Sequence, residues 1–229
     1  MSKPSSQQPI PSNKSIYPSS DESLLLVTNL SKSFGSTTVI NNFSYRFKAG
    51  AFGFVGPNGI GKSTLLSLVA GMLKADSGDV LINGASIQSA DLRAKAMLGY
   101  APDAKFIYPF MTGNELIELV CVVKSVNDKG QLLSIVDAFS LKQHLHVPFC
   151  EMSEGMQRKF ALVAALLGQN VVLVLDEPTN ALDERSVDFL REEILYRQQR
   201  SIILFATHDL GFLESVDATQ LNAQTLFNR

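Results

Sequence analysis

A glycine-rich segment in the first third of the sequence has the composition of a phosphate-binding loop. Residues 56–64 read Gly-Pro-Asn-Gly-Ile-Gly-Lys-Ser-Thr and match the pattern G-x-x-x-x-G-K-[ST]. Glycines let backbone amides turn inward around phosphate oxygens, and a helix that begins behind them adds partial positive charge. Lys62 would reach the β- and γ-phosphates of a nucleotide, and Ser63 would place its hydroxyl on Mg²⁺. The pattern therefore predicts a nucleotide site that contains Gly56, Pro57, Asn58, Gly59, Gly61, Lys62, Ser63 and Thr64.

Two adjacent carboxylates follow a run of apolar residues later in the chain. Asp176 and Glu177 come directly after residues 171–175, a segment of Val and Leu only. Taken alone, such a pair most often belongs to a solvated loop. Ligands of open α/β sheets bind at the carboxyl ends of strands, and here a phosphate-binding loop precedes the pair. Asp176 is therefore predicted to ligate Mg²⁺, and Glu177 to polarise an attacking water.

The segments around the glycine-rich loop read as strands and one helix. Period-two alternation and turn-prone Asn and Gly residues indicate short strands between residues 24 and 55. After Gly61, apolar residues at helical spacing indicate a helix, and residues 79–84 read as a strand that ends in an Asn-Gly turn. The glycine-rich loop thus lies between an apolar strand and a helix, which disfavours a chance glycine turn.

The second half of the sequence alternates helices with apolar strands. Thr112 and Glu115 fit a capping box at a helix start, and Asp128 fits the N-cap of a helix through Phe139. Alternation of this kind implies a parallel sheet that is covered on both faces. The elements expected after Cys150 are a helix at 153–168, a strand at 171–175, a helix at about 184–200 and a strand at 201–206.

These elements predict an α/β fold. The expected class is a P-loop NTPase core with a mostly parallel sheet and an antiparallel β subdomain on the N-terminal side. A small helical subdomain is expected at about 104–150. Residues 1–22 are rich in Ser, Pro and Gln and have few apolar groups to offset the entropy of ordering, which predicts a disordered tail.

Bulk composition disfavours several classes of function. The formal net charge of −2 and the pI near 5.9 supply no basic footprint, so no nucleic-acid partner is expected. No apolar run approaches the roughly 18 residues that are needed to cross a bilayer. Cys121 and Cys150 have no metal-ligand spacing, and no secretory leader is recognisable, which together indicate reduced thiols in the cytoplasm.

The order of these motifs resembles the nucleotide-binding subunits of ABC transporters, from about Leu24 to at least Asp209. Residues 153–156, Ser-Glu-Gly-Met, are similar to the signature motif L-S-G-G-Q of that family. The resemblance implies that Ser153 and Gly155 contact the γ-phosphate of ATP held by the opposite subunit, at a helix N-terminus whose dipole favours the anion. The alternative is an N-capped helix without a ligand.

Three further positions match the family residue by residue. Asp183 ends an Ala-Leu-Asp stretch similar to the D-loop, which communicates across a dimer of cassettes. His208 lies in an Ala-Thr-His-Asp stretch similar to the switch motif, which implies a contact with the γ-phosphate, although a lone His after a strand is ordinarily a surface residue. Phe34 falls where the family stacks an aromatic ring on adenine, although Phe43 and Phe47 are nearby and phenylalanine is commonly a core residue.

The sequence also departs from the family pattern. Asp103 stands in a loop that normally carries a Gln, which senses Mg²⁺ and the membrane partner. An anionic side chain could still reach a metal or a water, so Asp103 is a candidate metal-site residue. The signature begins with Met152 instead of Leu and has Glu154 at its third position. Ala164 replaces an Arg in the helix that follows, which predicts the loss of an ion pair between motifs.

The resemblance implies an ATPase that works as a dimer. Two cassettes, either two copies of this chain or this chain and a paralogue, would face each other. Each phosphate loop would then share its ATP and Mg²⁺ with the signature motif of the opposite chain. Lys62 would neutralise charge on the γ-phosphoryl group, and Glu177 would orient or deprotonate water. His208 would stabilise the transferring oxygens. The expected catalytic residues are therefore Glu177, His208 and Lys62.

Residues 23–229 are thus expected to form a single ABC ATPase cassette that powers transport. The S-x-G-M form of the signature favours an exporter with a separate membrane-spanning permease, at the cytoplasmic face of the inner or plasma membrane. Residues 106–110, Phe-Ile-Tyr-Pro-Phe, are either core or a docking site for that permease. The alternative function is a soluble non-transport ABC ATPase that acts on ribosomes or DNA, but the sequence has neither their tandem cassettes nor their coiled coils.

Overall fold

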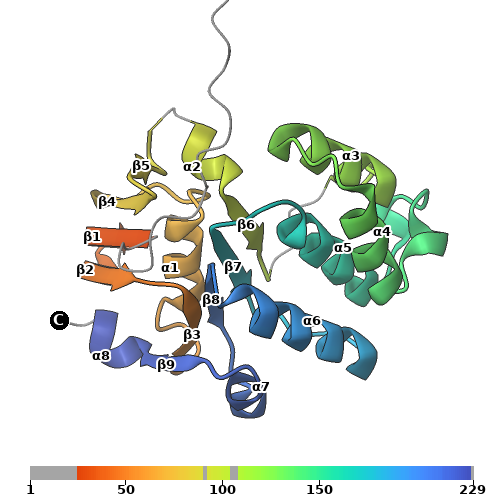
Figure 1. Cartoon of the computed structure of the whole chain (residues 1–229). Coiled ribbons are helices and arrows are strands. Elements are labelled where there is room, and N and C mark those ends of the chain that lie inside the picture. The colour runs from red at the N-terminus through yellow and green to blue at the C-terminus, as the bar shows by residue number, and fades with distance from the viewer. Residues whose placement is uncertain (1–24, 90–91, 104–107, 228–229) are drawn as a thin grey trace, which may run out of the picture.

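The computed structural model describes residues 25–89, 92–103 and 108–227, so the tail expected at residues 1–22 lies outside the described residues. Figure 1 shows two sheets beside a group of helices. The elements are, in chain order, β1 (Leu25–Phe34), β2 (Thr37–Phe47), β3 (Gly50–Val55), α1 (Lys62–Val69), β4 (Ser77–Ile82), β5 (Ala85–Ser86), α2 (Leu92–Ala96), β6 (Leu98–Ala101), α3 (Gly113–Lys124), α4 (Lys129–Ala138), η1 (Lys142–His144), η2 (Phe149–Glu151), α5 (Glu154–Leu166), β7 (Val172–Asp176), α6 (Glu184–Arg197), β8 (Ile202–Ala206), α7 (Leu210–Ser215), β9 (Thr219–Asn222) and α8 (Ala223–Phe227).

Five parallel strands form the central sheet in the order β6-β7-β8-β3-β9. Every residue of β7 and β8 is buried. Alternate side chains of β7 enter different cores: Val172 and Val174 pack in the core that contains α1, whereas Leu173 and Leu175 pack in the core that contains α5 and α6. A strand that is buried on both faces has to be apolar throughout, which explains the unbroken run of Val and Leu before Asp176.

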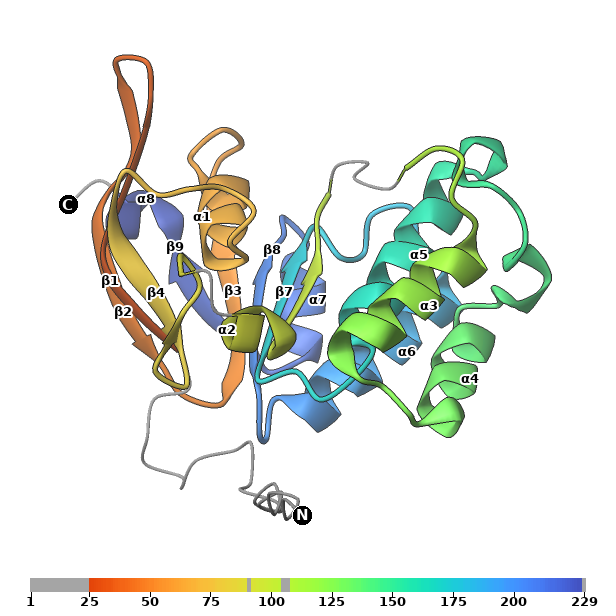
Figure 2. The ribbon, with the colours of Figure 1, turned by 90° about the horizontal axis from the view of Figure 1, so that it is seen from above.

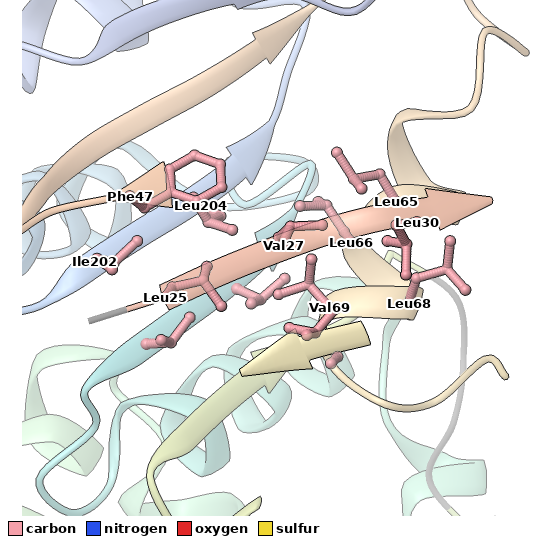
Figure 3. Packing of buried hydrophobic residues seen from close by; sticks show 14 of the residues in the cluster. Leu25, Val27, Leu30, Phe47, Leu65, Leu66, Leu68, Val69, Ile202 and Leu204 are labelled. Carbon is pink, nitrogen blue, oxygen red and sulfur yellow. The ribbon is translucent and has the colours of Figure 1, made fainter. Parts of the chain in front are cut away.

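Four antiparallel strands form the second sheet in the order β2-β1-β4-β5. Because β1 pairs on both sides, Leu25 lies opposite Phe47 of β2 and Ile82 of β4. Figure 3 shows side chains of this sheet, such as Val27, beside Leu66 of α1. One hydrophobic core therefore joins the antiparallel sheet, α1 and one face of the parallel sheet.

Helices α3 and α4 occupy the segment that the sequence places at about 104–150. The capping box of α3 is present: the Glu115 amide donates to Thr112 Oγ1 (3.3 Å), and the Thr112 amide donates to the Glu115 carboxylate (2.8 Å). Asp128 caps α4 by accepting a hydrogen bond from the Gln131 amide (3.0 Å). The limits of the subdomain and of the cassette stay predictions.

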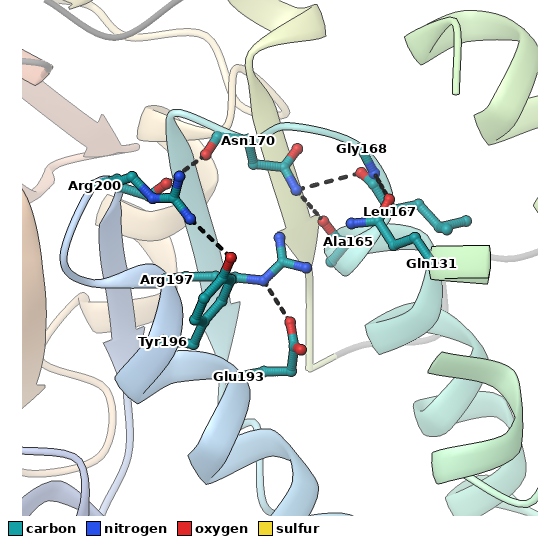
Figure 4. Close-up of polar contacts among 10 residues, drawn as sticks. Gln131, Ala165, Leu167, Gly168, Asn170, Glu193, Tyr196, Arg197 and Arg200 are labelled. Atoms are coloured by element: carbon teal, nitrogen blue, oxygen red, sulfur yellow. Dashed lines mark hydrogen bonds and ion pairs between the residues drawn. The ribbon is translucent and has the colours of Figure 1, made fainter. Parts of the chain in front are cut away.

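A polar cluster joins the helical segment to the chain just before β7 (Figure 4). The side-chain amide of Asn170 donates to the Ala165 carbonyl (2.8 Å), and Gln131 of α4 accepts a hydrogen bond from the Gly168 amide. Lys124 at the end of α3 donates to Asn170 Oδ1 (2.8 Å), and burial lowers the pKa of Lys124 to about 8. These bonds fix the ends of α3 and α5 and the start of α4 relative to the sheet.

The two sheets and the helices between their strands confirm the expected α/β fold with an antiparallel sheet on the N-terminal side. Two strands differ from what the sequence pattern indicates. β1 runs for 10 residues to Phe34, longer than the short strands expected in this region, because it pairs with β2 along this stretch. β9 has only one buried side chain and therefore no alternating pattern to reveal it. Among the described residues, no helix is long and apolar enough to cross a membrane.

We expect Thr112→Ala to lower the free energy of unfolding by about 1 kcal/mol, because α3 loses its N-cap hydroxyl. Thr112→Ser keeps the hydroxyl and should retain most of that stability. Urea unfolding monitored by far-ultraviolet circular dichroism measures both variants. Equal midpoints for Thr112→Ala and the unaltered protein would show that the cap does not stabilise the fold.

Candidate active site

The glycine-rich loop joins β3 to α1 at the carboxyl edge of the parallel sheet. Its residues 56–59 are exposed, whereas Gly61 is buried and has a backbone φ of 110°. A Cβ atom on Gly61 would lie 2.6 Å from Cγ1 of Val39, so glycine lets β2 approach the start of α1. No side chain caps α1, which leaves its first amides for a phosphate group.

Lys62 is the first residue of α1 and is only 7% exposed. Its ammonium group donates to the carbonyl oxygens of Gly56 (2.7 Å) and Pro57 (3.1 Å). These two bonds hold the cation inside the loop, where an arriving phosphate would meet it. The neighbouring Ser63 and Thr64 are exposed and half-buried at the same helix start.

Asp176, the last residue of β7, is buried, and its Oδ1 has no hydrogen-bond partner in the structure. Burial raises the pKa of Asp176, as do the charges of Asp103 and Glu177, whereas a hydrogen bond with Ser63 and the charge of Arg158 lower it. A carboxyl group in such surroundings is stabilised in its charged form by a nearby cation. The hydroxyl of Ser63 and the open Oδ1 of Asp176 therefore fit a Mg²⁺ ion.

A complete cage of protein ligands is not needed for such an ion. Within the part of the chain that the structure describes, no three His, Cys, Asp or Glu side chains gather into a metal cluster. Mg²⁺ characteristically takes one or two carboxylates and shares the remaining positions with water and substrate phosphates. The two protein ligands at this site, Ser63 and Asp176, agree with that coordination preference of Mg²⁺.

Glu177 follows Asp176 and has a backbone φ of 46°, in the left-handed region. A residue other than glycine stores strain there, which the surrounding structure must offset. The Glu177 amide donates to the carbonyl of Ala206 at the end of β8 (2.9 Å). Its Oε2 lies 3.1 Å from Nδ1 of His208, although the two atoms lack the alignment of a hydrogen bond. The structure therefore brings Glu177 and His208 together across two strand ends.

The signature-like residues stand at the start of α5. Ser153 is its N-cap and accepts a hydrogen bond from the Met156 amide (3.3 Å). Gly155 approaches the loop after β7 so closely that a Cβ atom would lie 2.6 Å from the Ala181 carbonyl oxygen. Figure 2 shows α1 and α5 on opposite sides of β6, β7 and β8. Ser153 and the phosphate loop of the same chain are thus separated by the sheet.

Asp183 has a structural role that the sequence did not reveal. Its carboxylate caps α6 by accepting a hydrogen bond from the Ser186 amide (2.9 Å). It also forms an ion pair with Lys159 of α5, whose hydrogen bond lowers the pKa of Asp183 to about 2. An ion pair thus joins the helix that follows the signature motif to the D-loop residue Asp183. It does not involve Ala164, which stands where the family has an Arg.

Phe34 is set apart from the other aromatic residues of its sheet. Its side chain is 52% exposed, whereas Phe43 and Phe47 are buried in the core. The ammonium of Lys32 lies 5.6 Å from the centroid of the Phe34 ring. Phe34 belongs to the β1–β2 hairpin, which projects at the same edge as the loop before α1 (Figure 2). Of the three rings, this one is available to a ligand at that edge.

Arg158 in α5 is a buried cation that belongs to none of the sequence motifs above. It is 7% exposed and donates to the carbonyl oxygens of Pro102, Asp176 and Glu177. The residue four positions later, Leu162, is fully buried, so helical periodicity places Arg158 on the inward face of α5. A charged residue on the apolar face of a predicted helix was the feature of the sequence that could have revealed Arg158.

A cavity of about 810 Å³ lies away from all of these residues. It is lined by the β4–β5 turn, the end of α2, the α3–α4 connection and Gly168, which belong to the amino edge of the parallel sheet. The phosphate loop lies at the opposite, carboxyl edge, with residues 56–59 exposed. In the candidate active site, residues 56–59 are thus open to solvent, whereas Lys62 and Asp176 are buried.

Comparisons with known proteins agree with this geometry. Residues 40–180 match the family described as ABC transporter. The chain is 32% identical over 197 residues to the uncharacterized ABC transporter ATP-binding protein YhcH of Bacillus subtilis, which covers 84% of this chain and 64% of YhcH. It is 28% identical over 193 residues to the lantibiotic transport ATP-binding protein SrtF of Streptococcus pyogenes, which covers 83% of this chain and 82% of SrtF.

A solved structure shares the fold. The dimeric ATP-binding cassette MJ0796, in a post-hydrolysis state bound to ADP and Pi, superimposes with a TM-score of 0.73 at 21% identity. The match covers 87% of this chain and 94% of that cassette. The chain spans slightly less than two thirds of the length of YhcH. Because the family match covers more than half of the sequence, the chain belongs to the ABC transporter family as an ATP-binding cassette.

Proposed function

We propose that this chain binds ATP and hydrolyses it. The observation that carries the proposal is the meeting of Ser63 with Asp176, and of Glu177 with His208, at neighbouring strand ends. A phosphate loop, a metal-binding carboxylate and a water-activating carboxylate then share one edge of the parallel sheet. Ligands of open α/β sheets bind at this edge.

Each residue of the candidate site has a separate role in phosphoryl transfer. Lys62 and the loop amides neutralise charge on the β- and γ-phosphates, while Ser63 and Asp176 would hold Mg²⁺. When bound, Mg²⁺ supplies Lewis-acid stabilisation of the phosphate oxygens. Glu177 takes a proton from the water that attacks the γ-phosphorus, and the bond from that phosphorus to the bridging oxygen of ADP breaks. His208 donates a hydrogen bond to the transferring oxygens.

A second cassette completes each site in this proposal. Ser153 at the start of α5 contacts the γ-phosphate that the phosphate loop of the opposite chain holds. Gly155 has no side chain, which lets the loop after β7 of its own chain lie close to this end of α5. Phe34 stacks on the adenine of its own chain's ATP, and Asp183 lies near the dimer interface. The exposure of Ser153 and Phe34 in the single chain supports this arrangement. The dimeric state of MJ0796 supports it too.

We further propose a separate membrane-spanning permease as the partner, with the cassette at the cytoplasmic face of the membrane. Tyr108 and Phe110 are 75% and 86% exposed, while Phe106 and Ile107 lie outside the described residues. The backbone between the exposed rings is held in place, because the carbonyl of Pro109 accepts a hydrogen bond from the Cys150 amide of η2 (2.8 Å). Exposed aromatic side chains on a backbone that is held in place suit a docking surface.

Helix α3 carries further apolar residues for contact with a permease. Its residues Leu119, Val122 and Val123 are more than half exposed, and their spacing places them on one helix face. The name of SrtF, a lantibiotic transport ATP-binding protein, supports a partner of this kind. We propose export as the direction, from the S-x-G-M form of the signature motif at Ser153.

Lys62→Ala should abolish nucleotide binding, because the variant loses the cation that Gly56 and Pro57 hold inside the loop. Titration of a fluorescent ATP analogue measures the affinity. Lys74→Ala, which removes an exposed lysine, serves as the matched control and should bind normally. If Lys62→Ala binds as tightly as the unaltered protein, the assignment of the phosphate loop is wrong.

Glu177→Gln should leave ATP binding intact and lower the turnover number by about 10²- to 10⁴-fold, the usual effect of losing a positioned base. ATP should then accumulate a stable dimer of the variant, which size-exclusion chromatography detects. Turnover at the original rate, with only monomer in the presence of ATP, would contradict the role proposed for Glu177.

Tyr108→Ala should weaken co-purification with the permease, while the isolated cassette keeps its melting temperature and ATP affinity, because the ring is exposed. Tyr196→Ala removes a similarly exposed tyrosine from α6 and should dock normally. A Tyr108→Ala protein that melts several degrees lower but still docks would identify the ring as a stabilising residue instead.

A further inference from the structure

Arg158 joins backbone segments that follow two different strands. Its Nη1 donates to the carbonyl of Pro102 after β6, and its Nη2 donates to the carbonyls of Asp176 and Glu177, the latter at 2.5 Å. The planar fork of an arginine serves several acceptors at once, which a lysine cannot reproduce. One side chain of α5 therefore holds the loop after β6 and the loop after β7 together.

The charge of Arg158 lies among anions. Burial lowers its pKa, and the carboxylates of Asp103, Asp176 and Glu177 raise it, with a smaller contribution from Tyr100. Carboxylates that crowd together in a poorly solvated place repel one another unless a cation stands between them. Arg158 supplies such a cation from the chain itself, and a metal ion that arrives with a nucleotide would supply another.

Arg158 also holds Glu177 in an unfavourable backbone conformation. Glu177 has a φ of 46°, and its carbonyl accepts hydrogen bonds from Arg158 and from the Asn180 amide (3.2 Å). Its own amide donates to Ala206 (2.9 Å). Bonds on both sides of the Glu177 Cα fix the direction of its side chain, which runs toward His208.

We propose that Arg158 is a positioning residue that sets the orientation of Glu177 and couples it to the start of α5. Arg158 follows Ser153 within the first turns of the same helix. A ligand that shifts Ser153 would therefore shift the carbonyls of Asp176 and Glu177 through the guanidinium group. The inference rests on the proposed ATP hydrolysis, and it gives Arg158 no contact with the nucleotide.

The test compares Arg158→Gln and Arg158→Lys in the full chain. Arg191→Gln is the matched control, since Arg191 lies on α6 with an exposed ion pair. We expect Arg158→Gln to lower kcat by at least about 30-fold while the dissociation constant of a fluorescent ATP analogue changes by less than about threefold. Arg158→Lys keeps the charge without the fork and should recover part of kcat. Arg191→Gln should match the unaltered protein.

Hydrogen exchange supplies a readout that does not depend on turnover. Amides in the segment after β7 should exchange faster in Arg158→Gln than in the unaltered protein, because the strained Glu177 conformation loses a support. Unchanged kcat in Arg158→Gln would overturn the inference. Equal losses of kcat and affinity with a lower melting temperature would do so too, as would failure of both variants to fold, since Arg158 would then serve stability alone.

The inference and the proposed function fail in different ways. Should the unaltered chain hydrolyse no ATP, the proposed function is wrong. Hydrogen exchange in the two Arg158 variants then still decides whether this side chain holds Glu177: faster exchange after β7 supports the inference, and unchanged exchange overturns it.

Discussion

Several carboxylates lie close together at the carboxyl end of β7, in a place that is largely shielded from water. Asp176 is buried, the side chain of Glu177 is 15% exposed, and Asp103 lies within electrostatic reach. Charged groups in such a place have to be balanced by donors and cations. The hydroxyl of Ser63 and the guanidinium of Arg158 supply part of that balance, and a metal ion brought with a nucleotide would supply more. The nucleotide binding and catalysis that we propose at this edge both depend on that balance of charge.

The order of the parallel strands explains why groups from distant parts of the sequence meet. β7, β8 and β3 are neighbours, and they are followed by Glu177, His208 and the loop that leads to Lys62, respectively. Because the strands are parallel, their carboxyl ends share one edge. The strands themselves are held by two hydrophobic cores, one on each face. The proposed catalytic residues Glu177 and His208 therefore follow strands that are buried along their whole length.

Local features of the structure were predictable from the sequence, and contacts between distant segments were not. Thr112 and Asp128 cap their helices as expected, since capping depends only on residues of the same turn. The bonds of Arg158 to loops after two strands, and the approach of His208 to Glu177, depend on strand order instead. A helical pattern shows that a residue points inward but not which carbonyl groups it will meet there.

Completion of each site by a second chain is tested most directly by measuring ATP hydrolysis as a function of protein concentration. With Mg²⁺ and saturating ATP, the rate per chain should rise with concentration and level off once dimers predominate. Analytical ultracentrifugation under the same conditions gives the dimer fraction, and the two curves should superimpose. A rate per chain that stays constant down to concentrations where only monomer is present, or an absence of hydrolysis at every concentration, would contradict a shared site.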